Sequence, residues 1–240
     1  IYCFTYSSNL FMVNSLIFFK SLIFNILFFL VSAIIGTLLF PVLISKNLSI
    51  KITSIWAKIT LYLLNKICNI DVNIVGLESF STKKVIFAVR HESALETILF
   101  LAYLPNIKYV LKKELLYIPF YGLFVWRCGH IIIDRTGRAS PILLMLKKIK
   151  NNLKCTESVV IFPHGTRVKP GLKENIKPGI YALYKHLNIA IIPVYMSTGE
   201  VWGRKGFIKN PGIVKVKFYD KINEGYGKNE FIKLLNSKLN

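Results

Sequence analysis

The sequence predicts an α/β fold: a mixed, mostly parallel central sheet flanked by helices, preceded by a hydrophobic helical segment. Two observations support this fold class. From Asp71 onward, short apolar runs alternate with helical patterns, which is typical of a sheet covered by helices. Before Asp71, long apolar stretches dominate the chain. We therefore expect an N-terminal helical region over residues 1–70 and an α/β domain over residues 71–240.

The most apolar part of the chain lies near its N-terminus. Residues 21–45 read SLIFNILFFLVSAIIGTLLFPVLIS, apolar except for Asn25 and small hydroxyl residues, and Lys20 and Lys46 bracket them. About 20 apolar residues cross a bilayer as a helix, so this stretch is predicted to span or anchor in a membrane. A signal peptide and a buried core helix are the alternatives, although the apolar region of a signal peptide has roughly 7–15 residues. Pro41 is expected to kink or end the helix.

A second helix is expected over residues 50–70, either lying on a membrane surface or packed on the α/β domain. The strands predicted after it read VNIVG, KVIFAV, KYVLK, HIIID, SVVIFP, IAIIPVYM and IVKVKFY. Helices are expected after Ser93 and around PILLMLKKI, GIYALYKHL and FIKLLNSKL. In such folds, binding sites form where strands end.

The net charge of +20 has three interpretations. Lysines can neutralise nucleic-acid phosphates, or they can favour an anionic membrane surface. They can also reflect a chain rich in Ile, Lys and Asn. The sequence contains no compact Arg-rich run with interleaved aromatic residues, so we expect no nucleic-acid partner.

Cysteine usage argues against a metal site and against a disulfide framework. Cys3, Cys68, Cys128 and Cys155 are scattered, without a CxxC spacing. Small buried thiols in a reducing compartment are the expected role. No metal or redox cofactor is predicted.

The first candidate catalytic motif is RHESALET, directly after the strand KVIFAV. If His91 precedes a helix and Glu96 lies in its first turns, both side chains can face one cleft. A carboxylate bonded to one imidazole nitrogen leaves the other free to accept a proton from a hydroxyl. The alternative is a capping box with Ser93 as N-cap and Glu96 at N3, and Glu96 could serve both purposes.

Basic residues follow two further strands. Lys112 and Lys113 begin the segment KKELLYIPFYG, which is expected to be a loop able to hold an anionic head group. In IIIDRTGR, Arg135 offers a planar fork of donors suited to phosphate. Solvated lysines and an Asp134–Arg135 surface turn are the alternatives.

The segment VVIFPHGTR follows a strand and suits a phosphate monoester. Gly165 allows close backbone approach, Thr166 adds a hydroxyl, and Arg167 adds a charged fork. A plain turn is the alternative. Lys177 precedes the next helix, where it could meet substrate or solvent, and Pro193 lies in the strand that follows.

The order and spacing of these segments resemble the glycerolipid acyltransferases of the bacterial 1-acylglycerol-3-phosphate acyltransferase family. That family carries a His-x4-Asp motif, an Ile-Pro-Phe-Phe-Gly block after basic residues, an Ile-Asp-Arg segment, a Phe-Pro-Glu-Gly-Thr-Arg motif and a late strand with proline. The resemblance extends roughly from Asp71 to Tyr219.

The resemblance implies roles for individual residues. His91 would be the general base, and Glu96 would orient it. The residues that the resemblance implies to contact or shape the substrate pocket are Lys112, Lys113, Arg135, Gly165, Thr166 and Arg167. We add His164, Lys177 and Pro193 as candidate substrate-binding residues.

Two residues depart from the family pattern. Glu96 replaces Asp, which keeps the charge and lengthens the side chain by one methylene. His164 replaces Glu, and an imidazole does not accept hydrogen bonds as a carboxylate does, so binding of the acceptor is affected.

The reaction implied is direct acyl transfer from acyl-CoA or acyl carrier protein to the sn-2 hydroxyl of lysophosphatidic acid, at the cytoplasmic side of a bacterial inner membrane. The acyl thioester is then a co-substrate, and no cofactor is needed. The chain carries no GxSxG elbow for a covalent intermediate. Other lysophospholipids, glycerol-3-phosphate and an acylated amino lipid stay open as acceptors, and so does a non-catalytic membrane lipid-binding protein.

Overall fold

This computed structural model describes residues 2–38, 40–79, 84–104, 106–118, 121–134, 140–153, 157–204 and 206–240. Side chains are described from residue 12 onward, except that of residue 152. A seven-stranded sheet forms the centre of the chain. Its strands are β1 (Ile70–Val75), β2 (Ile86–Val89), β3 (Lys108–Lys112), β4 (Ile131–Ile133), β5 (Val159–Ile161), β6 (Ile191–Met196) and β7 (Gly212–Phe218). All seven predicted strand segments therefore form strands.

The sheet is mixed and mostly parallel, as predicted. Its order is β1-β7-β6-β2-β5-β3-β4. Every neighbouring pair is parallel except β6 and β7, which run antiparallel. The strands β2 to β6 consequently end at one edge of the sheet, and β7 begins there.

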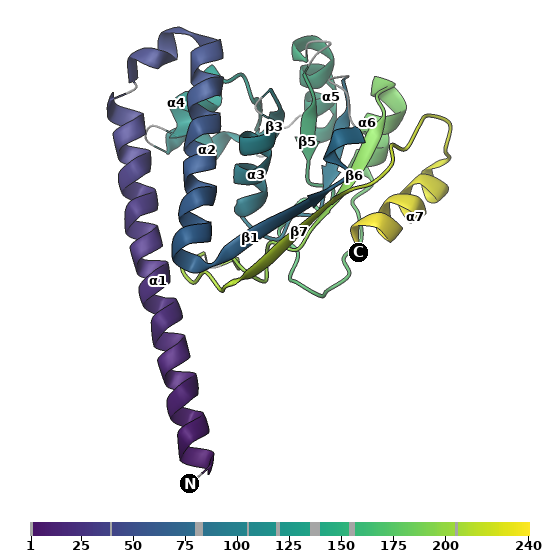
Figure 1. The fold of residues 1–240 in the computed structure, drawn as a ribbon. Helices are drawn as coiled ribbons and strands as arrows, with labels where there is room; N and C mark the ends of the chain where they lie inside the picture. The colour runs from purple at the N-terminus through teal and green to yellow at the C-terminus, as the bar shows by residue number, and fades with distance from the viewer. Residues whose placement is uncertain are drawn as a thin grey trace.

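Helices cover both faces of the sheet (Figure 1). They are α1 (Tyr2–Leu38), α2 (Lys46–Cys68), α3 (Leu95–Tyr103), α4 (Tyr121–Arg127), α5 (Pro141–Asn152), α6 (Gly179–Leu187) and α7 (Lys228–Leu239). In β2, Phe87 and Val89 face the apolar cluster beneath α2 and α3, whereas Ile86 and Ala88 face the cluster beneath α5, α6 and α7. This burial on both sides explains why β2 is apolar throughout.

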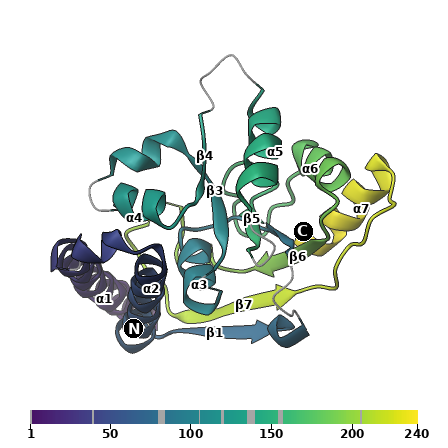
Figure 2. The same cartoon turned by 90° about the horizontal axis from the view of Figure 1, so that it is seen from above.

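The N-terminal residues form a helical hairpin. Helix α1 ends at Leu38, the short 3-10 helix η1 (Phe40–Ile44) contains Pro41, and α2 returns antiparallel to α1 (Figure 1). Seen from above, the hairpin stands at the opposite end of the molecule from α7 (Figure 2). The hydroxyls of Ser21, Ser32 and Thr37 donate to carbonyls four residues earlier, which satisfies them within an apolar helix.

One segment differs from its predicted conformation. The stretch after Lys112 was expected to be a loop, but it forms a 3-10 helix η3 (Lys113–Tyr117) followed by α4. Gly122 allows this close packing, since a Cβ atom there would lie 2.0 Å from the carbonyl oxygen of Leu116. The glycine is thus required by the contact between two short helices.

We predict that Gly122→Ala destabilises the fold, although alanine is otherwise the better helix former. Relieving the overlap with Leu116 requires a backbone shift that costs on the order of 1–3 kcal/mol. Thermal unfolding of the purified protein measures the effect. Gly227→Ala is the matched control, because nothing lies within 4 Å of its added Cβ. Equal melting temperatures for the two variants would contradict this account.

His130, just before β4, predicts a pH dependence of stability. Its Nδ1 atom accepts a hydrogen bond from the Tyr109 N–H at 3.2 Å. Burial, and then the nearby Lys108 and Lys46, lower the pKa of His130 to about 3. Below pH ~6.5 the unfolded chain therefore binds a proton at this position that the folded chain does not, and the folded state loses stability as the pH falls toward 3.

We expect His130→Asn to weaken this acid sensitivity, because asparagine keeps an acceptor for Tyr109 but does not titrate. The melting temperature should fall less in the variant than in the wild type between pH ~6.5 and ~4. Identical falls would show that another group is responsible.

Candidate active site

The candidate residues gather where parallel strands end. His91 follows β2, residues 162–167 follow β5, and residues 197–199 follow β6. Because β2 pairs in parallel with both β5 and β6, these three segments meet at one edge of the sheet. The position is the one that open α/β sheets use for binding sites.

His91 and Glu96 face each other, as the sequence predicted. The His91 Nδ1 and Glu96 Oε2 atoms lie 3.3 Å apart. Glu96 is fully buried, while the His91 side chain is 18% exposed. With Nδ1 directed at the carboxylate, Nε2 is the nitrogen left to meet a substrate hydroxyl.

Glu96 also accepts hydrogen bonds from the backbone. The N–H groups of Glu92 and Ser93 each donate to Glu96 Oε1 at 2.8 Å, and the Thr198 hydroxyl donates to the same oxygen. The Ser93 hydroxyl accepts from the Leu95 N–H at 3.1 Å, but the residue at the helix N-cap is Ala94. The predicted capping box is therefore wrong in its N-cap, which is Ala94 and not Ser93, although Glu96 does accept from the Ser93 N–H while it faces His91.

The His91 ring is fixed from a second side. It stacks on Phe162, with ring centroids 3.9 Å apart and an angle of 20° between the planes. The His91 carbonyl accepts from the Val168 N–H at 2.7 Å, which ties the segment after β5 to the catalytic candidate. Both contacts restrict the imidazole to one orientation.

A buried ion pair flanks His91. Arg90 Nε and Glu92 Oε1 lie 2.6 Å apart, and both residues are 3% exposed. The guanidinium also donates to the carbonyls of Leu172 and Leu239, and the Gly199 N–H donates to Glu92 Oε2 at 3.0 Å. These hydrogen bonds compensate the two buried charges, as burial of an ion pair requires, and they connect the segments around the site.

Sequence reasoning missed Arg90, Glu92, Phe162 and Thr198. A signal existed for the first two, because opposite charges flank His91 directly after a fully apolar strand. For Phe162 the signal was its place at the start of the segment FPHGTR, and for Thr198 there was none. Their contacts to His91 and Glu96 depend on how separate strands are aligned.

The turn at residues 163–167 lies beside His91 and is partly exposed to solvent. Gly165 has φ +74°, a left-handed conformation that favours glycine, and Gly165 and Thr166 are exposed. Arg167 is half-buried and its guanidinium donates to the Arg204 carbonyl at 3.4 Å. Lys177 is exposed and lies beside Gly165, since its Nζ would be 3.1 Å from an added Cβ. Two cations therefore lie at this turn.

His164 lies behind the turn. It is 1% exposed, and neither ring nitrogen has a hydrogen-bond partner among the described residues. Burial, followed by the nearby Arg90, lowers the pKa of His164, which favours the neutral imidazole. A contact between His164 and substrate stays a prediction, because the ring is covered in this structure.

The remaining predicted residues lie elsewhere or are not described. Lys112 and Lys113 are exposed at the end of β3, and the Lys113 Nζ atom lies 3.3 Å from Asp134 Oδ2. Pro193 is buried within β6, in register with Ala88. Arg135 lies outside the described residues. Roles for these four in substrate binding stay predictions.

No group of three or more His, Cys, Asp or Glu residues in the described part of the chain is placed to hold a metal ion. Of the cysteines, Cys68 and Cys128 are buried free thiols, as expected. The side chains of Cys3 and Cys155 lie outside the described residues.

Several known proteins are similar to this chain. The 1-acyl-sn-glycerol-3-phosphate acyltransferase of Pseudomonas aeruginosa is 29% identical over 161 residues, which cover 67% of this chain and 63% of the relative. The enzyme of the same name from Helicobacter pylori is 42% identical over 103 residues, covering 42% of this chain and 43% of the relative. The matched parts thus span less than two thirds of each relative.

A solved structure shares the fold. The 1-acyl-sn-glycerophosphate (LPA) acyltransferase PlsC from Thermotoga maritima superposes with a TM-score of 0.75 at 19% identity, covering 91% of this chain and 92% of PlsC. A sequence model of the Acyltransferase family matches residues 71–197, which include His91, Glu96 and Arg167. Since that match extends over more than half of the chain, and since the motifs around His91 and Arg167 meet at one sheet edge, the chain belongs to the Acyltransferase family.

Proposed function

We propose that this protein is a 1-acylglycerol-3-phosphate O-acyltransferase. It transfers a fatty acyl group from acyl-CoA or acyl carrier protein to the sn-2 hydroxyl of 1-acyl-sn-glycerol-3-phosphate, giving phosphatidic acid. The observation that carries the proposal is the His91–Glu96 pair, 3.3 Å apart, beside a turn that presents Arg167 and Lys177. The names of the Pseudomonas and Helicobacter relatives support the acceptor.

The histidine supplies proton transfer in both directions. His91 Nε2 takes the proton of the sn-2 hydroxyl as its oxygen attacks the thioester carbonyl, and Glu96 stabilises the imidazolium through Nδ1. When the tetrahedral intermediate collapses, the C–S bond breaks and the imidazolium returns the proton to the thiolate. The enzyme is restored without a covalent acyl intermediate.

The acceptor phosphate would be bound at the turn after β5. Arg167 provides a planar fork of donors and Lys177 a mobile ammonium, and a phosphate monoester carries the charge that both favour. Gly165 leaves the backbone of the turn uncovered. The turn lies next to His91, because the Val168 N–H donates to the His91 carbonyl at 2.7 Å, so an acceptor whose phosphate is bound there would lie within reach of the imidazole.

Membrane association follows from the surface of the N-terminal hairpin. Met12–Leu38 of α1 is long and apolar enough to cross a membrane. Within its most apolar stretch of 18 residues, only 17% is buried inside the protein. Large exposed apolar residues of α1, η1 and α4 include Phe19, Ile26, Phe29, Ile44, Leu123 and Trp126. Arg127 connects α4 to η1, because its guanidinium donates to the carbonyls of Leu43 and Ile44. We place the protein at the bacterial inner membrane, with its α/β domain on the cytoplasmic side.

His91→Ala is expected to lower the rate of acyl transfer by about 10²–10⁴, the contribution of a positioned general base. The measurement is incorporation of labelled acyl groups from acyl-CoA into lysophosphatidic acid by membranes that contain the protein. His186→Ala is the control, because His186 is exposed on α6.

Retained turnover in His91→Ala would exclude His91 as the base. A wild-type protein that binds lysophosphatidic acid in vesicles without acylating it would instead favour a lipid-binding role. A panel with glycerol-3-phosphate and other lysophospholipids tests the specificity for the acceptor. Comparing acyl-CoA with acylated acyl carrier protein identifies the donor.

Arg167→Ala should raise the KM for lysophosphatidic acid by roughly 10–100-fold, since a hydrogen bond to a charged group contributes about 1.5–3 kcal/mol. The control is the KM for a monoacylglycerol acceptor. This acceptor carries no phosphate, so its KM should be the same in Arg167→Ala and in the wild type. An unchanged KM for lysophosphatidic acid would remove Arg167 from the phosphate site.

A further inference from the structure

Lys209 is a buried cation that connects the loop after β6 to helix α1. The residue is 1% exposed. Its Nζ atom donates to Asn25 Oδ1 at 2.8 Å, to the Phe207 carbonyl at 2.9 Å and to the Gly206 carbonyl. All three ammonium hydrogens are therefore used, and one of them reaches the middle of the apolar helix.

Aromatic rings enclose the same ammonium. Lys209 Nζ lies 4.4 Å from the centroid of the Trp202 ring and 5.2 Å from that of Phe24 on α1. The two rings meet edge to face, 5.7 Å apart. We call Lys209, Asn25, Phe24 and Trp202 the Lys209 clasp. Cation–π contacts of this kind are strongest where water is excluded.

The clasp is more than a source of stability. Burial lowers the pKa of Lys209 to about 8, so desolvation of the charge offsets much of what its contacts contribute. Lys209→Met would leave Asn25 Oδ1 and the carbonyls of Phe207 and Gly206 without this donor, which costs stability. The same contacts also fix where the loop lies, because they connect it to Asn25 on α1.

The other end of this loop contacts the catalytic carboxylate. The Thr198 hydroxyl donates to Glu96, and the Trp202 N–H donates to the Thr198 carbonyl at 2.9 Å. The Gly199 N–H donates to Glu92. The Arg204 carbonyl, on the same loop, accepts from the Arg167 guanidinium. One loop thus touches α1, Glu96 and the candidate phosphate contact.

We propose that Lys209 is a positioning residue: by fixing the loop over residues 197–210 on α1, it holds Thr198 against Glu96 and keeps His91 oriented. The inference rests on the proposed acyl transfer. The position of helix α1 and the geometry of the His91–Glu96 pair then depend on the same loop.

The test compares Lys209→Met with Lys209→Arg in the full chain in membranes. Methionine keeps the apolar stem and removes the charge, and we expect kcat for acylation of lysophosphatidic acid to fall about 10–100-fold, the cost of misplacing catalytic groups by roughly 1 Å. The KM for the acyl donor should stay unchanged, because no donor contact is altered. Arginine keeps the cation and should restore kcat at least in part.

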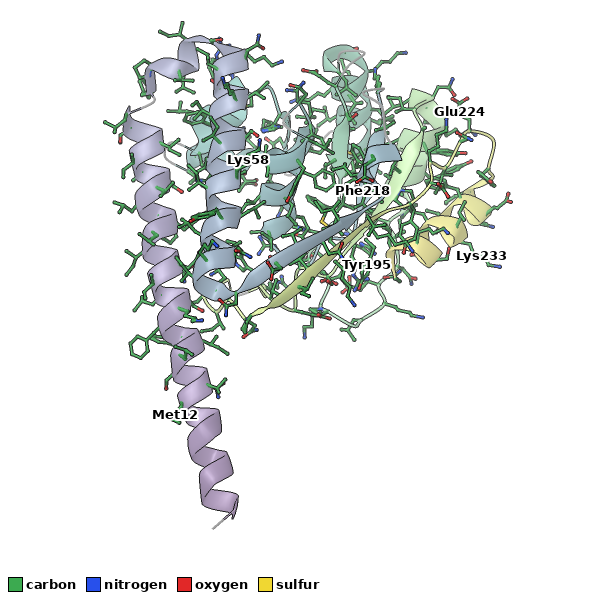
Figure 3. The ribbon with its side chains drawn as sticks, viewed as in Figure 1. Met12, Lys58, Tyr195, Phe218, Glu224 and Lys233 are labelled. Carbon is green, nitrogen blue, oxygen red and sulfur yellow. The ribbon has the colours of Figure 1, made fainter. Side chains whose placement is uncertain are left out.

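Lys233→Met is the matched control. Lys233 is exposed on α7, at the far end of the molecule from α1 (Figure 3), so loss of its charge should leave kcat as in the wild type. Asn25→Leu removes the acceptor on α1 and should lower kcat as Lys209→Met does. Asn25→Leu also removes the hydrogen bond from Asn25 Nδ2 to the Phe207 carbonyl at 3.0 Å, so the double variant should lose about as much as Asn25→Leu alone and less than the sum of the two single variants.

Amide hydrogen exchange provides a readout that does not depend on activity. In Lys209→Met, exchange over residues 197–204 and 206–210 should accelerate more than exchange in β2 and β5. Unchanged exchange in the loop, or an active wild type whose Lys209→Met variant keeps its kcat, overturns the inference. A wild type that fails to acylate any acceptor overturns the proposed function instead, and the exchange experiment still decides whether the clasp fixes the loop. Should Lys209→Met fail to fold, Asn25→Leu and Lys209→Arg decide the question.

Discussion

The Glu96 carboxylate is the contact on which the geometry of the site depends. It is fully buried, and two segments converge on it: the turn from β2 into α3, which contains His91 and Ser93, and the loop after β6, which contains Thr198. A carboxylate with several donors on it has one orientation, so the imidazole that faces it is also restricted. The extra methylene of glutamate relative to aspartate is accommodated because Glu96 reaches back over the first turn of its own helix to the N–H of Ser93.

The sequence was sufficient to predict the sheet because its central strands β2 and β5 are buried on both faces, whereas β1 and β7 alternate between buried and more exposed residues. Runs such as IFAV in β2 have no polar position, and Gly or Pro residues and charges punctuate them clearly. It was insufficient for α4, because the contact of Gly122 with Leu116 is a matter of packing that composition does not reveal. For the site, local motifs identified His91 and Glu96. The contacts of Phe162 and Thr198 depend on strand order, which no single segment encodes.

Helix α1 combines two environments along one length. Ser21 and Asn25 face the loop that carries Lys209, whereas Phe29 is 68% exposed. The N-terminal part of α1, near Met12, projects beyond the α/β domain (Figure 3). The Asn25 side chain is satisfied within the protein, because it accepts from Lys209 and donates to the Phe207 carbonyl.

The reversal of strand direction between β6 and β7 has a mechanical consequence. A parallel β7 would have required a crossover back to the opposite edge of the sheet, with a helix in between. The antiparallel arrangement lets the chain leave β6 and enter β7 at one edge, within residues 197–211. This short loop connects Thr198, which contacts Glu96, to Lys209, which contacts helix α1. Insertions in this stretch would keep the contacts at both ends of the loop but would no longer fix the distance between them.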